Sequence, residues 1–180
     1  MQSVSDPPKN AAHVRFHLLD RIETVTDDRL VAVKAVSQAE EYLADHFPTF
    51  PVLPGVMMLE AATQACFWLA LRRSGFSFSV GVLKAARNIR YGHFVSPGRT
   101  LRIATTYDKP TTGGHAFRIE GTVETGTQTA TAITGKLELA CFRLADRGEG
   151  LSGLDERLAA AHRERWADLT LSEANLALPA

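Results

Sequence analysis

Apolar and polar residues alternate along several runs of this chain, and such alternation predicts β-strands. The first two runs, residues 16–25 and 30–36, flank a turn at Asp27 and Asp28 and predict a β-hairpin. Long strands that follow one another through glycine- and proline-rich turns favour an antiparallel sheet. Four further runs of this kind predict strands at residues 80–91, 100–108, 116–125 and 127–142.

One segment breaks the alternation. Residues 56–73 are apolar on nearly every face apart from Glu60, Thr63 and Gln64, which predicts a buried helix about 27 Å long. A short helical turn is predicted at residues 39–43. A long buried helix together with an antiparallel sheet predicts an α+β fold in which the sheet wraps around the helix.

The composition changes after Asp146. Three glycines at positions 148, 150 and 153 predict a linker, and residues 154–169 predict an amphipathic helix. We therefore expect a core domain at residues 1–146, followed by a linker and C-terminal helical extension at residues 147–180. The helix face expected to pack on the core, or on a neighbouring subunit, contains Leu154, Leu158, Ala161, Arg165, Trp166 and Leu169.

The bulk composition is that of an ordinary globular protein. Apolar residues make up 45% and charged residues 22% of 180 residues, enough for a core without disulfides or metal. Residues 1–10 lack the apolar stretch of a signal peptide, which predicts a cytoplasmic location. The apolar run at residues 56–71 is too short to span a membrane. Neither cysteine belongs to a metal-binding motif, and we expect Cys66 to be a buried, reduced thiol.

The charge is unevenly distributed although the net charge is zero. Residues 61–107 contain no Asp or Glu. A local basic field of this kind can attract an anionic partner, although the same side chains can also be solvated on scattered faces. The cations in this stretch are Arg72, Arg73, Lys84, Arg87, Arg90, Arg99 and Arg102.

Glu60 is the most informative position for chemistry. It lies in the second turn of the predicted buried helix, so we expect it to be largely buried. A buried carboxyl group without a cationic partner tends to keep its proton and can then act as a general acid. Gln64 lies four residues on, shares the helix face and can hydrogen-bond Glu60. The alternative is a structural ion pair between Glu60 and an arginine.

His46 is the second candidate among the six histidines. It begins a segment with prolines at positions 48, 51 and 54 that leads directly into the predicted helix. Each proline fixes its own φ and restrains the residue before it, so this loop should be stiff. An imidazole titrates near neutral pH and is a competent base. A lone histidine is, however, more often an ordinary surface or core residue.

Pro54 and Gly55 stand at the start of the same helix. The first N–H groups of a helix have no intrahelical partner and carry the positive end of the helix dipole. Because Gly55 has no side chain, a carbonyl oxygen could approach its N–H, as required to stabilise an enolate or oxyanion. A Pro-Gly pair is also common in a simple transition from loop to helix.

Together these residues resemble the signature of the FabA/FabZ-type 3-hydroxyacyl-[acyl-carrier-protein] dehydratases. The thirteen residues between His46 and Glu60 match the spacing in that family. Further matches lie at residues 19–22 and 94–98, and the resemblance covers about residues 14–144. The matching signature residues are His46, Phe47, Pro48, Pro51, Val52, Pro54, Gly55, Glu60, Ala61 and Gln64.

The resemblance implies a hotdog fold and the dehydration of a (3R)-3-hydroxyacyl thioester to the trans-2-enoyl product, in fatty acid or related lipid or polyketide biosynthesis. His46 would be the base that removes the α proton, and Glu60 the acid that protonates the departing hydroxyl. Gly55 and Val56 would bind the thioester carbonyl. Gln64 would orient Glu60.

Partners and assembly are also implied by the resemblance. The substrate would be carried on the phosphopantetheine of an acidic acyl carrier protein, docked on the cations of residues 61–107. No metal or redox cofactor is implied, because the reaction is an acid–base elimination. The family forms homodimers, in which His46 of one subunit would face Glu60 of the other, with a trimer of dimers as a larger assembly. Nucleic acid is not an expected partner.

Two positions depart from the family pattern, because Asp45 and Thr49 stand where many members have glycine. A carboxylate at Asp45 would favour the protonated form of His46, and Thr49 would reshape the substrate entry. Relatives that use Asp as the acid often also isomerise the product double bond, so Glu60 favours plain dehydration. Two other functions stay open: a hotdog acyl thioesterase, and a non-catalytic hotdog module that binds acyl carriers.

Overall fold

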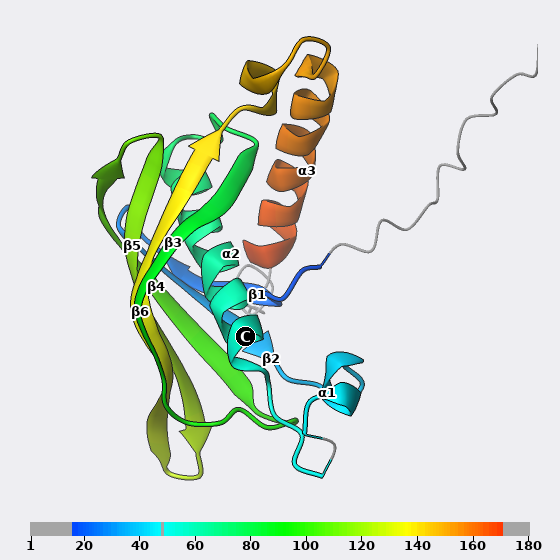
Figure 1. Cartoon of the computed structure of the whole chain (residues 1–180), viewed down its shortest axis with the longest axis vertical. Helices are drawn as coiled ribbons and strands as arrows, with labels where there is room; N and C mark the ends of the chain where they lie inside the picture. Colours follow the sequence, from blue (N-terminus) through cyan, green and yellow to red (C-terminus); the bar gives the residue numbers. More distant parts are fainter. Residues whose placement is uncertain (1–15, 48, 171–180) are drawn as a thin grey trace, which may run out of the picture.

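A computed structural model describes residues 16–47 and 49–170. Within this part of the chain, six strands form one antiparallel sheet in the order β1-β2-β4-β5-β6-β3 (Figure 1). The elements along the chain are β1 (Arg21–Val25), β2 (Arg29–Ala35), α1 (Tyr42–Asp45), α2 (Gly55–Arg73), β3 (Val80–Tyr91), β4 (Thr100–Thr111), β5 (Gly114–Thr125), β6 (Gln128–Phe142), the 3₁₀ turn η1 (Leu144–Arg147) and α3 (Ser152–Thr170).

Helix α2 packs lengthwise against one face of the sheet (Figure 1). Its contact face is fully buried and includes Cys66 and Leu69. The facing strands alternate in the same sense: on β5, Phe117, Ile119, Gly121 and Val123 are buried, and the residues that alternate with them are more exposed. The sheet and helix therefore share one apolar core, which confirms the predicted α+β arrangement.

Most predicted elements agree with the structure to within a few residues. β3 has the predicted bounds, and β4 continues three residues beyond its predicted end. The prediction of a strand at residues 16–20 was wrong, because β1 begins only at Arg21. The predicted helical turn at residues 39–43 was displaced. Residues 37–40 instead form a turn in which the Glu40 N–H donates to the Ser37 carbonyl at 3.3 Å, and α1 follows it.

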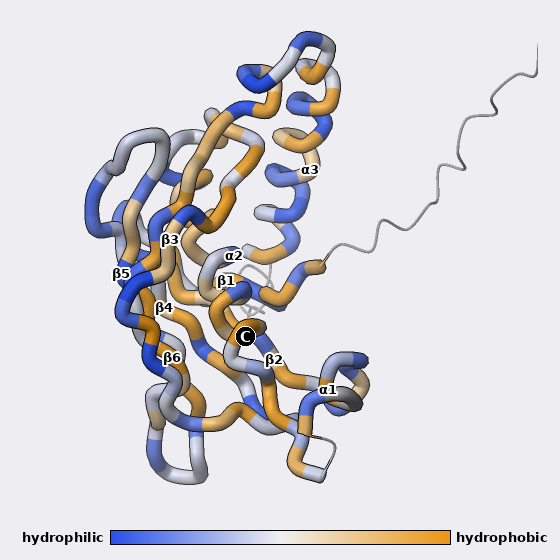
Figure 2. The backbone as a smooth tube through the Cα atoms, in the orientation of Figure 1, coloured by the Kyte–Doolittle hydropathy of each residue, from blue (hydrophilic) through white to orange (hydrophobic). Residues whose placement is uncertain are grey.

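Helix α3 packs on the core of its own chain, over the C-terminal end of α2 (Figure 1). It alternates hydrophilic and hydrophobic residues along its length (Figure 2), and Leu169 is 1% exposed. The expected packing face was wrong at Leu154, which is 39% exposed, whereas Asp155 beside it is buried. Hydrogen bonds hold Asp155 in this buried position, because its carboxylate accepts from Ser79, from Arg143 and from the Leu144 N–H.

The cysteines behave as the sequence predicts. Both are free thiols, and Cys66 is fully buried, where its Sγ lies 3.0 Å from the hydroxyl of Thr105. Burial raises the pKa of the Cys66 thiol to about 12, so this side chain is an unreactive residue of the core. None of the helices in residues 16–47 and 49–170 is long and apolar enough to cross a membrane.

Candidate active site

The side chain of Gln64 fixes the orientation of Glu60. Its Nε2 donates to Glu60 Oε1 at 2.9 Å, one turn earlier on α2. The same Nε2 donates to the Phe16 carbonyl at 3.0 Å, and Gln64 Oε1 accepts from the Leu18 N–H at 3.0 Å. Because both the donor and acceptor ends of the amide are occupied, Gln64 cannot rotate away from Glu60 without breaking a bond. The expected contact between Gln64 and Glu60 is therefore present, supported by the segment before β1.

Glu60 itself is only half-buried, which corrects the expectation that it would be largely buried. The first turns of α2 are partly open, and the side chain of Val56 is 69% exposed. In the part of the chain that the structure describes, no lysine or arginine forms an ion pair with Glu60. The alternative of a structural ion pair with an arginine is therefore not found among these residues.

Two backbone donors are available at the start of α2. The Pro54 carbonyl accepts from the N–H groups of Met57 and Met58 at 2.9 and 3.1 Å. The N–H groups of Gly55 and Val56 donate to no other described residue. They lie at the positive end of the helix dipole, where an anionic or polarised oxygen is stabilised.

Tyr91 is a site residue that the sequence reasoning missed. A Cβ atom placed on Gly55 would lie 3.0 Å from the Tyr91 ring, tighter than normal van der Waals contact. Gly55 therefore makes room for the last residue of β3 at the start of α2. No local motif identifies Tyr91, because the contact joins residues 36 positions apart and depends on how β3 ends beside the helix.

The loop that carries His46 is held at several points. His46 ends α1, and Phe47 turns the chain with a φ of 52°, a left-handed conformation that is uncommon for a bulky residue. The Phe47 carbonyl accepts from the Phe50 N–H at 2.8 Å, and the Leu53 N–H donates to the Val95 carbonyl at 2.8 Å. The loop is therefore bonded within itself and to the segment after β3, as expected for a stiff support of His46.

A buried ion pair holds the segment that precedes α1 and this loop. The Nζ of Lys34, on β2, donates to Glu40 Oε1 at 2.7 Å, and the Ser37 N–H donates to the same oxygen at 2.9 Å. Tyr42 donates to the other carboxylate oxygen of Glu40. Burial raises the pKa of Glu40, but the bonds from Lys34, Tyr42 and Ser37 more than offset this, so the pKa lies below its ordinary value. Burial and the Glu40 carboxylate raise the pKa of Tyr42.

His46 and Glu60 do not meet within one chain. Among the described residues, no hydrogen bond or ion pair joins them, and the His46 ring instead packs on Phe47 with ring centres 4.5 Å apart. The predicted effect of Asp45 falls on a side chain outside the described part of the structure, and Thr49 is exposed. No group of three or more described His, Cys, Asp or Glu residues is placed to hold a metal ion.

Exposed apolar side chains gather on the loop, at the start of α2 and along β3. In the sheet of the described residues β3 is an edge strand of twelve residues, so one row of its backbone hydrogen-bonding groups has no partner strand there. A cluster of apolar side chains beside an open strand edge is typical of an interface. The exposed apolar residues are Phe47, Phe50, Val56, Val82, Tyr91 and Phe94.

The seven cations of residues 61–107 do not form a single continuous surface. They come from α2, β3, β4 and the turn before β4, and they line separate hollows. Three of them are engaged in ion pairs: Arg73 with Asp28, Lys84 with Glu138 and Arg102 with Glu23.

Comparison with known proteins assigns the family. The family model described as "ApeI-like: ApeI dehydratase" matches residues 22–133. A relative named 3-hydroxyacyl-[acyl-carrier-protein] dehydratase FabZ, from Clostridium perfringens, is 31% identical over 68% of this chain and 81% of its own length. A protein of the same name from Alkalilimnicola ehrlichii is 30% identical over 78% of this chain and 90% of its own length.

Solved structures support the fold. The "Dehydratase Heterocomplex ApeI:P" from Xenorhabdus doucetiae has a TM-score of 0.54 at 21% identity, over 72% of this chain and 86% of that chain. A hypothetical thioesterase from Streptococcus pneumoniae has a TM-score of 0.51 at 13% identity, over 67% and 88%. At these identities the likeness shows the fold alone, because one fold carries several activities. With the hotdog fold and the family match in agreement, this chain belongs to the ApeI-like family of FabA/FabZ-type hotdog dehydratases.

Proposed function

We propose that this protein dehydrates (3R)-3-hydroxyacyl thioesters, carried on acyl carrier protein, to trans-2-enoyl thioesters. Membership of a dehydratase family gives the reaction class. The single observation that carries the residue assignment is the Glu60–Gln64 pair, held one turn and a half beyond two helix N–H groups that donate to no described residue. A positioned carboxyl group beside an oxyanion-binding helix start suits elimination next to a carbonyl.

In the proposed mechanism His46 takes the proton from the α carbon of the substrate. The electron pair of that C–H bond forms the α,β double bond, and the bond from the β carbon to its hydroxyl breaks. Glu60 donates a proton to the departing hydroxyl, which leaves as water. The N–H groups of Gly55 and Val56 stabilise the negative charge that develops on the thioester oxygen. Gln64 keeps Glu60 directed at the β position.

The proposed site is shared between two subunits of a homodimer. The open edge of β3 and the apolar residues around it support this assembly, because a second subunit would pair the edge and cover them. The absence of a bond between His46 and Glu60 in the described chain fits a site completed by His46 from the partner.

The reaction is tested by incubating the protein with 3-hydroxyacyl carrier substrates of graded chain length and following products by mass spectrometry. Loss of 18 mass units identifies the enoyl product, whereas release of a free acid would instead identify a thioesterase. We expect His46→Ala and Glu60→Gln each to lower kcat by about 1000-fold while the protein stays folded. A Glu60→Gln protein that keeps more than about a tenth of the wild-type kcat would contradict the assignment.

Shared sites are tested by mixing two inactive variants. In a His46→Ala/Glu60→Ala heterodimer, one composite site receives both substitutions and the other receives neither. Random exchange makes about half the dimers mixed, so activity should recover to roughly a quarter of wild type. If mixtures shown to contain heterodimers stay as inactive as the separate variants, both residues act within one subunit.

The acidic carrier is the proposed partner of this site. Of the seven cations of residues 61–107, those free of ion pairs among the described residues are available to it. Salt screens attraction between exposed charges, so raising the ionic strength should reduce kcat/KM for the carrier-bound substrate. A pantetheine-linked substrate should be much less affected. Equal salt sensitivity for both substrates would show that the carrier does not dock by charge.

A further inference from the structure

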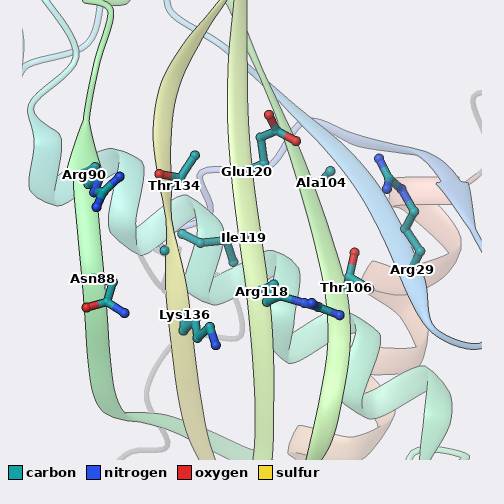
Figure 3. Close-up of a pocket in the computed structure, with 11 residues that line it drawn as sticks. Arg29, Asn88, Arg90, Ala104, Thr106, Arg118, Ile119, Glu120, Thr134 and Lys136 are labelled. Carbon is teal, nitrogen blue, oxygen red and sulfur yellow. The ribbon is translucent and has the colours of Figure 1, made fainter.

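The face of the sheet opposite α2 carries a line of cations at one register. Arg29 on β2 pairs in register with Thr106 on β4, which pairs with Arg118 on β5. Arg118 in turn pairs with Lys136 on β6, which pairs with Arg87 on β3. Directly paired residues share one face of a sheet, so four cations lie along a line that crosses five strands. Arg90, on β3, adds a fifth beside it (Figure 3). We call Arg29, Arg87, Arg90, Arg118 and Lys136 the cationic row.

The cationic row borders a hollow. Four of its members line a shallow trough of about 590 Å³ together with Thr106, Thr134 and Glu120, and α2 passes behind the strands (Figure 3). All five cations are exposed. In the described part of the chain the one ion pair of the row is between Arg118 and Asp108, at 3.9 Å.

The arrangement is unfavourable for the folded chain on its own. Like charges directly opposite each other on neighbouring strands destabilise a sheet, and Lys136 lies between Arg118 and Arg87. Other cations of this protein have carboxylate partners, such as Lys84 with Glu138 at 2.9 Å. In the described part of the chain Arg29, Arg87, Arg90 and Lys136 form no ion pair, although strand register brings them together on one face, and folding alone does not explain this arrangement.

We propose that the cationic row is a docking surface for an acidic helix of a protein partner. Neighbouring strands lie about 4.8 Å apart, so the line from Arg29 to Arg87 spans about 19 Å. A helix of about 13 residues has this length, and carboxylates every three or four residues on one face recur about every 5 to 6 Å. That repeat matches the strand spacing, so one helix laid across the strands presents a carboxylate to each cation.

The carboxylates on this face favour a protein over a phosphate polymer or a membrane. Glu120 lies in the trough and Asp108 beside Arg118, where each would repel a uniformly anionic surface. A protein can place its carboxylates against the cations and avoid these two positions. The residues that line the trough include no aromatic side chain to stack on a nucleic-acid base or enter a membrane interface. This surface lies away from the Glu60 helix and goes beyond the proposed reaction.

The test measures binding to the full chain by fluorescence anisotropy at low ionic strength. The probe is a labelled helical peptide of about 14 residues with glutamates on one face, and a peptide of the same composition with scattered glutamates is its control. The row variant is Arg29→Gln/Arg118→Gln. The matched variant, Arg157→Gln/Arg163→Gln, removes the same charge from two exposed arginines of α3, outside both the row and the cations of residues 61–107. We expect the row variant to bind the patterned peptide about tenfold more weakly and the matched variant to bind as wild type.

Three outcomes would overturn the proposal. They are equal weakening by both variants, equal binding of the two peptides, and tighter binding of duplex DNA or phosphatidylserine vesicles than of the patterned peptide. The row variant should melt close to wild type, because loss of Arg118 relieves its repulsion with Lys136 and removes only a long, exposed ion pair with Asp108. Lys136→Gln, a single change at the centre of the row, gives an independent answer and should weaken the peptide about threefold.

Discussion

The two ends of helix α2 differ in how completely the chain covers them. At the C-terminal end, Phe67 packs against Phe78 and against His162 of α3, and Trp68 packs against His162 and Trp166 of α3, with ring centres 5.1 to 6.1 Å apart. Helix α3 is fastened there by the buried carboxylate of Asp155. At the N-terminal end, Val56 is exposed, Glu60 is half-buried and two N–H groups have no described acceptor.

The two ends of α2 therefore have different roles: the C-terminal end contributes to stability, and the N-terminal end carries the proposed chemistry. The chain closes the C-terminal end itself, because exposed aromatic rings would be costly in water. It leaves polar groups and apolar side chains open at the N-terminal end, which a second subunit and a substrate would cover in the proposed function. Substitutions at the C-terminal end should therefore affect folding, and substitutions at the N-terminal end should affect turnover.

The largest expected effect comes from removing α3. Truncation after Gly150 exposes Trp68 and deletes the buried Leu169 and the half-buried Trp166. Burying side chains of this size contributes about 1.5 to 3 kcal/mol each, so we expect the free energy of unfolding to fall by about 5 kcal/mol. Urea denaturation followed by tryptophan fluorescence and circular dichroism measures the change. The truncation also tests the predicted division between residues 1–146 and 147–180.

A truncated protein that unfolds at the wild-type urea midpoint but has lost turnover would contradict this division of roles between the two ends of α2. Such a result would mean that α3 acts on the chemistry rather than on the fold. As a control, Leu154→Ala changes an exposed residue of the same helix and should leave the free energy of unfolding within about 0.5 kcal/mol of wild type.

The second largest effect is expected at the N-terminal end, on turnover. Gln64→Ala removes the hydrogen bond that orients Glu60, so kcat should fall by about 10- to 100-fold with little change in KM. Gln128→Ala makes the same chemical change at the exposed first residue of β6 and should leave kcat unchanged. A lower melting temperature with an unchanged kcat would make Gln64 a structural residue.

Gln64 also marks the limit of prediction from sequence. Its contact with Glu60 follows from their spacing on one helix turn, and the strands and α2 follow from apolar periodicity and turn residues. Its bonds to Phe16 and Leu18 join residues 48 and 46 positions apart, respectively. Those backbone groups bind an amide side chain and not a neighbouring strand, whereas the Asp20 N–H already donates to the Val33 carbonyl on β2. This explains why residues 16–19 have a strand pattern but are not a strand.

The sequence shows only which cations lie close together along the chain. It does not show which of them share one face of the sheet. The stretch at residues 61–107 includes Arg87 and Arg90, but the other cations of the row, Arg29, Arg118 and Lys136, lie outside it. Strand register brings them together, and register depends on the whole sheet. The exposure of Glu60 was misjudged for a related reason, because an apolar pattern does not distinguish burial within the chain from the burial by a second subunit that the proposed function requires.

A moderate effect is expected from Glu40, which supports the loop that carries His46. Glu40→Gln weakens the bonds from Lys34, Tyr42 and Ser37, so α1 and His46 should be held less firmly. We expect kcat to fall about fivefold and the free energy of unfolding to fall by about 1 to 2 kcal/mol. Glu41→Gln changes the exposed neighbour and should alter neither quantity. A stability loss with unchanged kcat would show that the ion pair does not position the loop.

The smallest expected effect is the pH dependence of that stability difference. The pKa of Glu40 lies below its ordinary value of 4.5 in the folded chain, because the bonds from Lys34, Tyr42 and Ser37 outweigh the effect of burial. Below pH 4.5 the unfolded chain binds this proton more readily than the folded chain. The stability that the carboxylate contributes is therefore complete above pH 4.5 and is lost as the pH falls through the folded pKa.

The gap in free energy of unfolding between wild type and Glu40→Gln should therefore be constant from about pH 7 to 5.5 and narrow at about pH 3.5, measured by urea denaturation. Glu41→Gln should track wild type at every pH. A Glu40→Gln gap that stayed constant down to pH 3.5 would mean that the charge of Glu40 contributes nothing to the fold and that only its hydrogen bonds do.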